Sequence, residues 1–266
     1  MPSVVFDINQ KPNNEQEFLR WFSQKFNFDE KRYKVYYEQT TKGLREGFVN
    51  SVFWKKIEDN LREWDLSYLI DKKVHLVSSP TLPMIVVKPL GSLLNKAYRK
   101  NILQNNNFPL EPLGGWVNQE NWFDRIHDII RTSFEVKYLD GVKFLEEKLT
   151  ETAQSVRCDF YCSYEAREEG YYAAHASLKM ELPLLLPDWT QKDYTIEMEI
   201  QITTEFQEMI KSLLHKYYEV NRKTIKDENY KWQWDYQSEQ FIPNYLGHIA
   251  HYLEGMIVEI RDKQNS

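Results

Sequence analysis

Cysteine and glycine are scarce in this chain, whose 266 residues include two cysteines and nine glycines. Cys158 and Cys162 lie four residues apart in a predicted strand, where a disulfide between them would be strained, so we expect two free thiols. Free thiols are typical of a reducing compartment, and we therefore expect a cytoplasmic protein. The low glycine content and the absence of a G-x-x-x-x-G-K motif exclude a glycine-rich phosphate loop.

Long apolar runs and an excess of basic charge are missing too. The apolar segments fall far short of a membrane span, so we expect no membrane partner, and the amino-terminal segment lacks the pattern of a signal peptide. A net charge of -6 disfavours basic charge spread over the whole surface, although it permits a local basic patch. Aromatic residues are abundant, with 8 Trp, 17 Tyr and 14 Phe, and they predict a substantial core.

Hydrophobic periodicity divides the chain into three regions. Residues 1–75 have the pattern of helices, with Phe18, Trp21 and Phe22 at helical spacing. In residues 76–222, short apolar strands alternate with helices, and in residues 223–266 an aromatic polar loop precedes a last helix packed on the core. The expected strands are 126–136, 156–164, 172–182 and 194–203. The expected helices are 89–104, 140–153, 204–222 and 244–262. This pattern predicts an α/β (α+β) fold, with a mixed sheet flanked by helices and helical extensions at both ends.

A basic helix face begins at Lys88-Pro89, where proline suits the first position of a helix. Lys88, Ser92, Lys96 and Arg99 fall on one side of that helix. Free N–H groups at a helix start, together with converging cations, suit a polyphosphate. A solvated basic face would have the same spacing, so the pattern alone leaves both interpretations open.

Two carboxylates are candidates for a metal site. Asp128 lies in an apolar segment that we expect to be a strand, where a lone carboxylate is costly unless it is paired or binds a cation. Glu199 shares one strand face with Gln201, although a solvated strand residue would look the same. Oxygen ligands from two strands suit Mg²⁺ with a bound polyphosphate. His127-Asp128 also spells the metal pair of a phosphohydrolase, but only His75 precedes it.

A glycine turn at Gly170 opens the strand that carries Tyr171 and His175. These two side chains share a face by the period of two, and the Tyr171 ring could stack on a base. A core tyrosine and a hydrogen-bonded histidine are the more common explanation of such a pattern.

In their order along the chain, these segments resemble the synthetase domain of the RelA/SpoT family, the pyrophosphokinases that make the alarmone (p)ppGpp. The family's K-x-x-x-S-x-x-x-K segment is matched by Lys88, Ser92 and Lys96, and its aspartate in an apolar strand is matched by Asp128. Its basic segment before an aromatic strand is echoed by residues 157–160. The K-x-N-G-Y-x-x-x-H motif is matched in part by Arg167, Gly170, Tyr171 and His175. The E-I-Q-I-R-T strand is matched by residues 199–204.

The resemblance implies a nucleotidyltransferase-like core that transfers the β,γ-pyrophosphate of ATP to the 3′-hydroxyl of GDP or GTP, with Mg²⁺ as cofactor. It implies that Asp128 and Glu199 are the catalytic and metal-binding residues. The ATP phosphates would contact Lys88, Ser92 and Lys96, with Arg99 and Arg157 as further candidates. The acceptor would contact Arg167, Tyr171, His175 and Gln201.

Several positions depart from the family pattern. Val86 and Thr203 stand where the family has arginines, and Glu168-Glu169 stands where it has a small residue and an asparagine. These departures leave fewer cations to bind phosphates, so the sequence predicts the identity of the acceptor less firmly than the fold. Two further interpretations therefore stay open beside a small stand-alone alarmone synthetase. Under each of the three, the protein could form a homo-oligomer.

The first alternative is the toxin branch of the family, which pyrophosphorylates the 3′-CCA end of tRNA and is neutralised by an antitoxin protein. A helical stripe could follow the tRNA backbone, although a solvated face explains it too; the stripe comprises Lys211, His215, Arg222 and Lys226. The second alternative is a non-catalytic relative that binds a nucleotide or a partner protein.

Overall fold

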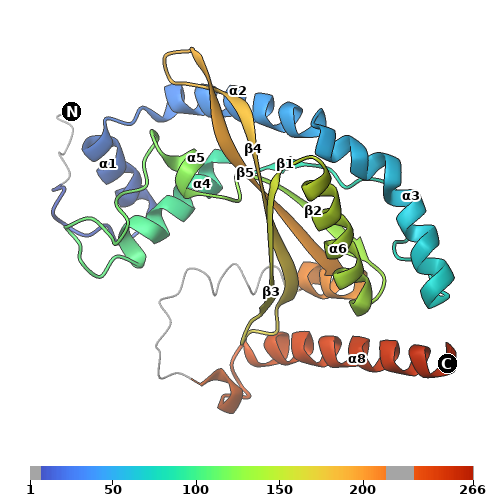
Figure 1. Cartoon of the computed structure of the whole chain (residues 1–266). Coiled ribbons are helices and arrows are strands. Elements are labelled where there is room, and N and C mark those ends of the chain that lie inside the picture. Colours follow the sequence, from blue (N-terminus) through green and yellow to red (C-terminus); the bar gives the residue numbers. More distant parts are fainter. Residues whose placement is uncertain (1–6, 214–230, 266) are drawn as a thin grey trace. The chain divides into compact units, whose positions relative to one another are not determined.

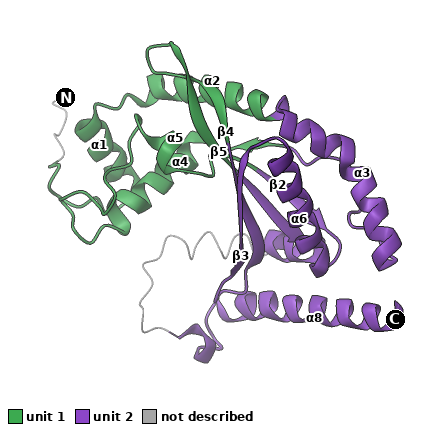
Figure 2. Cartoon of the chain, viewed as in Figure 1, with its two compact units in different colours: residues 1–48, 85–131, 180–198 green, residues 49–84, 132–179, 199–266 purple. Residues whose placement is uncertain are grey.

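The computed structural model describes residues 7–213 and 231–265 of the chain (Figure 1). These residues belong to two compact units, each built from several separate segments of the sequence (Figure 2). The first unit draws on the described residues within 1–48, 85–131 and 180–198, and the second on those within 49–84, 132–179 and 199–266. Helices and a mixed sheet make up the described chain, so the predicted α+β class is confirmed.

The described residues contain a five-stranded sheet with the strand order β1-β2-β5-β4-β3. The strands are β1 (Val86–Val87), β2 (Ile130–Val136), β3 (Asp159–Ala166), β4 (Tyr172–Leu185) and β5 (Gln191–Thr204). β1 pairs antiparallel with β2, and β3 pairs antiparallel with β4 from Asp159 opposite Lys179 to Ala166 opposite Tyr172. Strands β2, β4 and β5 each run from one unit into the other along the chain.

Aromatic side chains form the core of the first unit. Its helices are α1 (Glu15–Phe26), most of α2 (Glu30–Val49), α4 (Leu90–Tyr98), the π-helical segment Arg99–Leu103 and α5 (Trp122–Arg125). Trp21 and Trp122 are fully buried, and Tyr37 packs edge-on against Trp122. The Tyr37 hydroxyl donates a hydrogen bond of 2.7 Å to the carbonyl of Lys88. The aromatic core therefore anchors the backbone at the start of the basic segment.

The second unit contains β3, the lower-numbered part of β4 and several helices. These helices are α3 (Val52–Lys72), α6 (Leu139–Ser155), a helix over residues 205–213, the 3₁₀ turn Trp232–Trp234 and α8 (Phe241–Asn265). α6 contacts α3, β3 and α8. Buried Asp65 accepts hydrogen bonds from the backbone N–H groups of Leu76 and Val77, which ties the segment after α3 to that helix.

The elements mostly follow the predicted pattern, with one informative correction. The strand expected at 126–136 begins only at Ile130, and residues 126–129 form the link from α5 to β2. Ile126 and Ile129 are buried without belonging to a strand, which is why their apolar pattern imitated one. Residues 214–222 of the helix predicted at 204–222 lie outside the described residues.

Two further expectations can be compared with the structure. Both cysteines are free, as predicted. Within the described ranges, no helix combines the length and apolar content needed to cross a membrane.

Candidate active site

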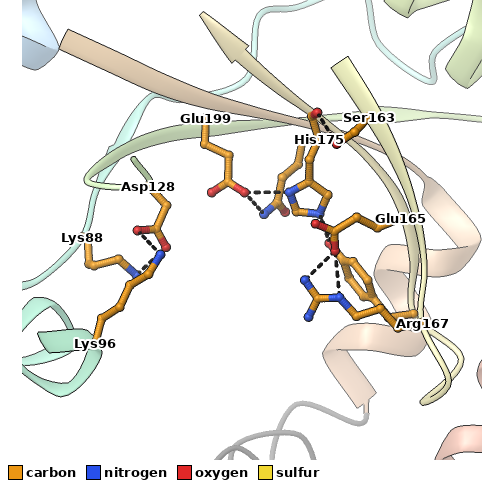
Figure 3. Close-up of polar contacts among 10 residues, drawn as sticks. Lys88, Lys96, Asp128, Ser163, Glu165, Arg167, His175 and Glu199 are labelled. Carbon is orange, nitrogen blue, oxygen red and sulfur yellow. Dashed lines mark hydrogen bonds and ion pairs between the residues drawn. The ribbon is translucent and has the colours of Figure 1, made fainter. Parts of the chain in front are cut away.

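Two lysines hold one carboxylate in the first unit. Lys88 Nζ lies 3.0 Å from Asp128 Oδ2, and Lys96 Nζ donates to Asp128 Oδ1 at 2.8 Å (Figure 3). Asp128 lies in the turn before β2, and not in a strand as we had expected. Lys88 reaches it because the N–H of Lys88 continues the pairing of β1 with β2 through a 2.8 Å hydrogen bond to the carbonyl of Ile129. Lys96 approaches from α4.

The two lysines keep this carboxyl group ionised. Burial would raise the pKa of Asp128, but hydrogen bonds and charge from Lys96 and Lys88 outweigh burial and hold the pKa below its ordinary value. Burial lowers the pKa of the Lys88 ammonium, and Asp128 opposes that shift. Arg131 is an electrostatic neighbour of Lys88, and Lys100 is a neighbour of Lys96, Arg99 and Arg125. The cluster is therefore a partly buried anion surrounded by several cations.

The structure also locates the three other residues that were predicted to contact ATP. Ser92 is exposed in the first turn of α4, where backbone N–H groups without helical partners are available to an anion. Arg99 is the first residue of the π-helical segment that continues α4. Arg157 belongs to the second unit, at the turn between α6 and β3, with a φ of 59°. Thus Lys88, Ser92, Lys96 and Arg99 share one unit, and Arg157 does not.

A chain of hydrogen bonds links Tyr171, His175 and Glu199 in the second unit. The Tyr171 hydroxyl lies 2.9 Å from His175 Nε2, and His175 Nδ1 lies 2.7 Å from Glu199 Oε1. A carboxylate accepts only, so Nδ1 carries the proton and Nε2 accepts from the tyrosine. Gln201 donates to the same Glu199 oxygen at 3.3 Å. The predicted catalytic residue Glu199 and the predicted acceptor residues Tyr171, His175 and Gln201 are thus joined in one network.

Arg167 lies beside this network and is paired with an acid that the sequence did not single out. Its guanidinium contacts Glu165 through Nε at 2.7 Å and through Nη2, and it lies over the Tyr171 ring at 5.1 Å from the ring centre. Glu165 Oε2 also lies 3.8 Å from His175 Nε2. Glu165 lies near the end of β3 and Arg167 just beyond it, and nothing in the sequence indicated that Glu165 lies beside Tyr171.

Burial raises the pKa of the Tyr171 hydroxyl. Arg167 opposes this shift, and the carboxylates of Glu165, Glu199 and Glu208 add to it. The hydroxyl is therefore protonated at neutral pH and serves as the donor to His175.

A small pocket adjoins Tyr171 and contains the position where the family pattern has an arginine. Its lining comprises Gly170, Tyr171, Tyr172, Thr203, Gln207, Ile210 and Lys211. Lys211 donates to Glu208 at 2.8 Å, one turn back on the same helix. The other members of the predicted stripe, His215, Arg222 and Lys226, lie outside the described residues. Lys211 itself therefore lines the pocket beside Tyr171, a place that its helical spacing could not indicate.

Neither a protein-family model nor a curated protein matches this sequence. Solved structures do match it. The crystal structure of small alarmone synthetase 1 from Bacillus subtilis aligns with a TM-score of 0.51 and 19% identity, covering 89% of this chain and 98% of that chain. The chain has the small alarmone synthetase fold.

Two further structures show the same fold. The Bacillus subtilis synthetase bound to its product pppGpp aligns with a TM-score of 0.50 at 19% identity, again covering 89% of this chain and 98% of that chain. A protein from Streptococcus mutans aligns with a TM-score of 0.50 at 18% identity, covering 89% of this chain and 96% of that chain. The fold expected from the ordered motifs is therefore confirmed.

The donor atoms of the two carboxylates on this fold suit a hard cation. Within the described ranges, no three Cys, His, Asp or Glu side chains gather into a metal-binding group. Mg²⁺ needs fewer protein ligands than that, because it is bound through one or two carboxylates together with substrate phosphates and water. Asp128 fits this role, since its carboxyl group is held ionised. Each of its two oxygens contacts a lysine, and the same two lysines would also attract phosphate oxygens.

Proposed function

We propose that this protein is an ATP-dependent pyrophosphokinase that transfers the β,γ-pyrophosphate of ATP to the 3′-hydroxyl of a guanine nucleotide, making an alarmone of the (p)ppGpp type. The observation that carries the proposal is the cluster of Lys88, Lys96 and Asp128 beside the start of α4. The shared fold supports it, because one structure with that fold contains pppGpp.

The donor phosphates would bind in the first unit. Lys88 and Lys96 supply the positive charge, and the first turn of α4 with Ser92 supplies hydrogen-bond donors. Asp128 and Glu199 would hold Mg²⁺, which when bound neutralises phosphate charge. Arg99 and Arg157 are further candidates for phosphate contacts. Positioning and charge stabilisation dominate phosphoryl-transfer catalysis, so a set of fixed cations is what the reaction needs.

The acceptor would bind in the second unit. Tyr171 offers its ring to the base, and Arg167 offers its guanidinium to the phosphates. Glu199 would accept the proton of the attacking hydroxyl, and the hydrogen bonds from His175 and Gln201 orient its carboxylate for this role. His175 would act as a positioning residue towards Glu199 in the same step.

A labelling experiment tests the proposal. The protein is incubated with γ-labelled ATP and Mg²⁺ and, in parallel, with GDP, GTP, ATP or bulk tRNA, and an Asp128→Asn variant serves as the control. We expect label in the guanine nucleotide, stoichiometric release of AMP and no label with the variant. Label in tRNA alone would identify a tRNA-modifying enzyme instead, and label in no acceptor would indicate a non-catalytic nucleotide-binding protein.

A further inference from the structure

Helix α8 meets the turn that precedes Tyr171 at a contact between two backbones. Gly170 and Gly247 are both buried. A Cβ built on Gly247 would lie 2.9 Å from the carbonyl carbon of Gly170 and nearer still to its oxygen. A Cβ on Gly170 would lie 3.0 Å from the backbone nitrogen of His248, and Gly170 also has a φ of +77°. Only glycine fits at either position without moving the helix or the turn.

His248 bonds both sides of the same turn. Its Nε2 lies 3.0 Å from the carbonyl oxygen of Glu168, and its Nδ1 lies 2.8 Å from the hydroxyl of Tyr172. A carbonyl accepts only, so Nε2 carries the proton and Nδ1 accepts from the tyrosine. One imidazole from α8 thus connects Glu168, inside the glycine turn, to Tyr172, the first residue of β4. Tyr171 lies between these two anchored positions.

Two aromatic contacts add to the contact between α8 and the segment around the glycine turn. The Tyr172 ring stacks on His251, with ring centres 3.7 Å apart and planes within 1°. The Trp232 ring lies parallel to His248, with centres 6.3 Å apart and an interplanar angle of 7°. Gln233 donates to the Glu168 side chain at 3.1 Å. The turn is therefore held by α8 and also by the short segment before it.

The hydrogen bonds within the turn define its conformation, but they do not fix its position relative to α8. The N–H of Gly170 donates to the carbonyl of Arg167, and the N–H of Arg167 donates to the carbonyl of Tyr171, both at 2.9 Å. We infer that Gly247 and His248 are positioning residues, which fix the turn so that the Tyr171 ring is ready for the acceptor base. The inference rests on the proposed function for the role of Tyr171 and extends it to a helix more than 70 residues later in the sequence.

A pair of glycine substitutions on one helix provides the first test. Gly247→Ala introduces the clash, whereas Gly255→Ala is a matched control because nothing lies within 4 Å of its added Cβ. Hydrogen exchange of the peptide that spans residues 166–172 is measured together with the KM values for acceptor and ATP. For Gly247→Ala we expect at least tenfold faster exchange in this peptide, at least a fivefold higher acceptor KM and an unchanged ATP KM. Gly255→Ala should match the wild type in all three.

Substitutions of His248 keep the test decisive if Gly247→Ala does not fold. His248→Leu removes the donor to Glu168, whereas His248→Gln retains an N–H near the position of Nε2. We expect the leucine variant to show the higher acceptor KM and the faster exchange, and the glutamine variant to recover part of both. Wild-type exchange and acceptor KM in the leucine variant would overturn the inference, as would faster exchange with an unchanged acceptor KM.

The exchange measurement also separates this inference from the proposed function. If the wild-type protein transfers no pyrophosphate, the proposed function is refuted, and exchange alone then decides whether α8 holds the turn. Faster exchange in His248→Leu would support the contact, and exchange equal to that of the wild type would overturn it.

Discussion

The candidate residues fall into a donor half in the first unit and an acceptor half in the second unit, and the two halves have opposite charge balances. Around the donor lysines and Lys100 the electrostatic neighbours are mainly cations, with Asp128 as the anion among Lys88, Lys96, Arg99, Lys100, Arg125 and Arg131. Around Tyr171 the groups that influence its pKa are one cation, Arg167, and three carboxylates, Glu165, Glu199 and Glu208. The first half is suited to a dense negative charge, and the second half is not.

This difference bears on which substrate each half selects. A triphosphate bound among several partly buried cations is stabilised by direct ion pairs. A polyphosphate near three carboxylates is opposed by like charges, at a cost that grows with each added phosphate. ATP therefore suits the first half, and the second half would discriminate among acceptors by their charge. Substitutions in each half test this comparison.

The largest expected effect comes from removing one carboxylate charge in each half. Asp128→Asn and Glu199→Gln preserve size, and each should reduce transfer by about 10²–10³-fold, the usual loss for one electrostatic group in an active site. We expect Asp128→Asn to raise the ATP KM as well, and Glu199→Gln to act on kcat with both KM values unchanged. Steady-state kinetics with circular dichroism as the folding control provide the measurement. If either variant retains more than about a tenth of the rate, a loss below ~1.4 kcal/mol, its assigned role is wrong.

The second prediction concerns the ring and the hydroxyl of Tyr171 separately. Tyr171→Ala should weaken acceptor binding by about 1–3 kcal/mol, the usual contribution of a stacked base. Tyr171→Phe keeps the ring and loses only the hydrogen bond to His175, so acceptor affinity should stay near that of the wild type. Calorimetric titration of each variant with a non-reacting acceptor measures both effects. Equal affinity in the wild type and the alanine variant would exclude Tyr171 from the site.

The sequence predicted the sheet and helices well because burial periodicity is a local signal. It misplaced Asp128 because Ile126 and Ile129 are buried without strand pairing, and periodicity does not distinguish the two cases. The acids near Tyr171 were missed for a different reason. Glu165 comes from β3 and Glu208 from the helix after β5, so only the folded chain brings them together. The contact of α8 with the glycine turn is likewise tertiary.

The third prediction compares two carboxyl groups whose pKa values shift in opposite directions. Burial raises the pKa of Glu254 on α8, and hydrogen bonds from Thr204 and Gln207 only partly offset it, whereas the pKa of Asp128 is lowered. An acid with a raised pKa binds its proton more tightly in the folded state, so the free energy of unfolding falls as pH rises above its ordinary value of 4.5. The lowered pKa of Asp128 has the opposite effect on the free energy of unfolding. Its stabilising contribution is present at neutral pH and is lost as the pH falls.

Glu254→Gln should therefore stabilise the protein at neutral pH, by about 1 kcal/mol on the scale of one unsatisfied buried polar group. The gain should disappear below pH 4.5, where both states bind the proton. Urea denaturation at the two pH values measures it, with Glu259→Gln, at an exposed position on the same helix, as the control. A gain that is equal at both pH values would show that the ionisation of Glu254 is not its cause.

The smallest expected effect tests the charge of the acceptor half directly. Glu208→Gln removes one of the three acids near Tyr171 and the partner of Lys211, which lines the adjoining pocket. The KM for GTP as acceptor should fall by up to about fivefold, corresponding to about 0.2–1 kcal/mol for one partly exposed charge. The KM for guanosine monophosphate should fall less, and the KM for ATP should not change. Glu205→Gln is the matched control, because Glu205 lies on the same helix but is not among the charges that shift the pKa of Tyr171. Equal changes for the two guanine nucleotides would mean that the acids do not select the acceptor by its charge.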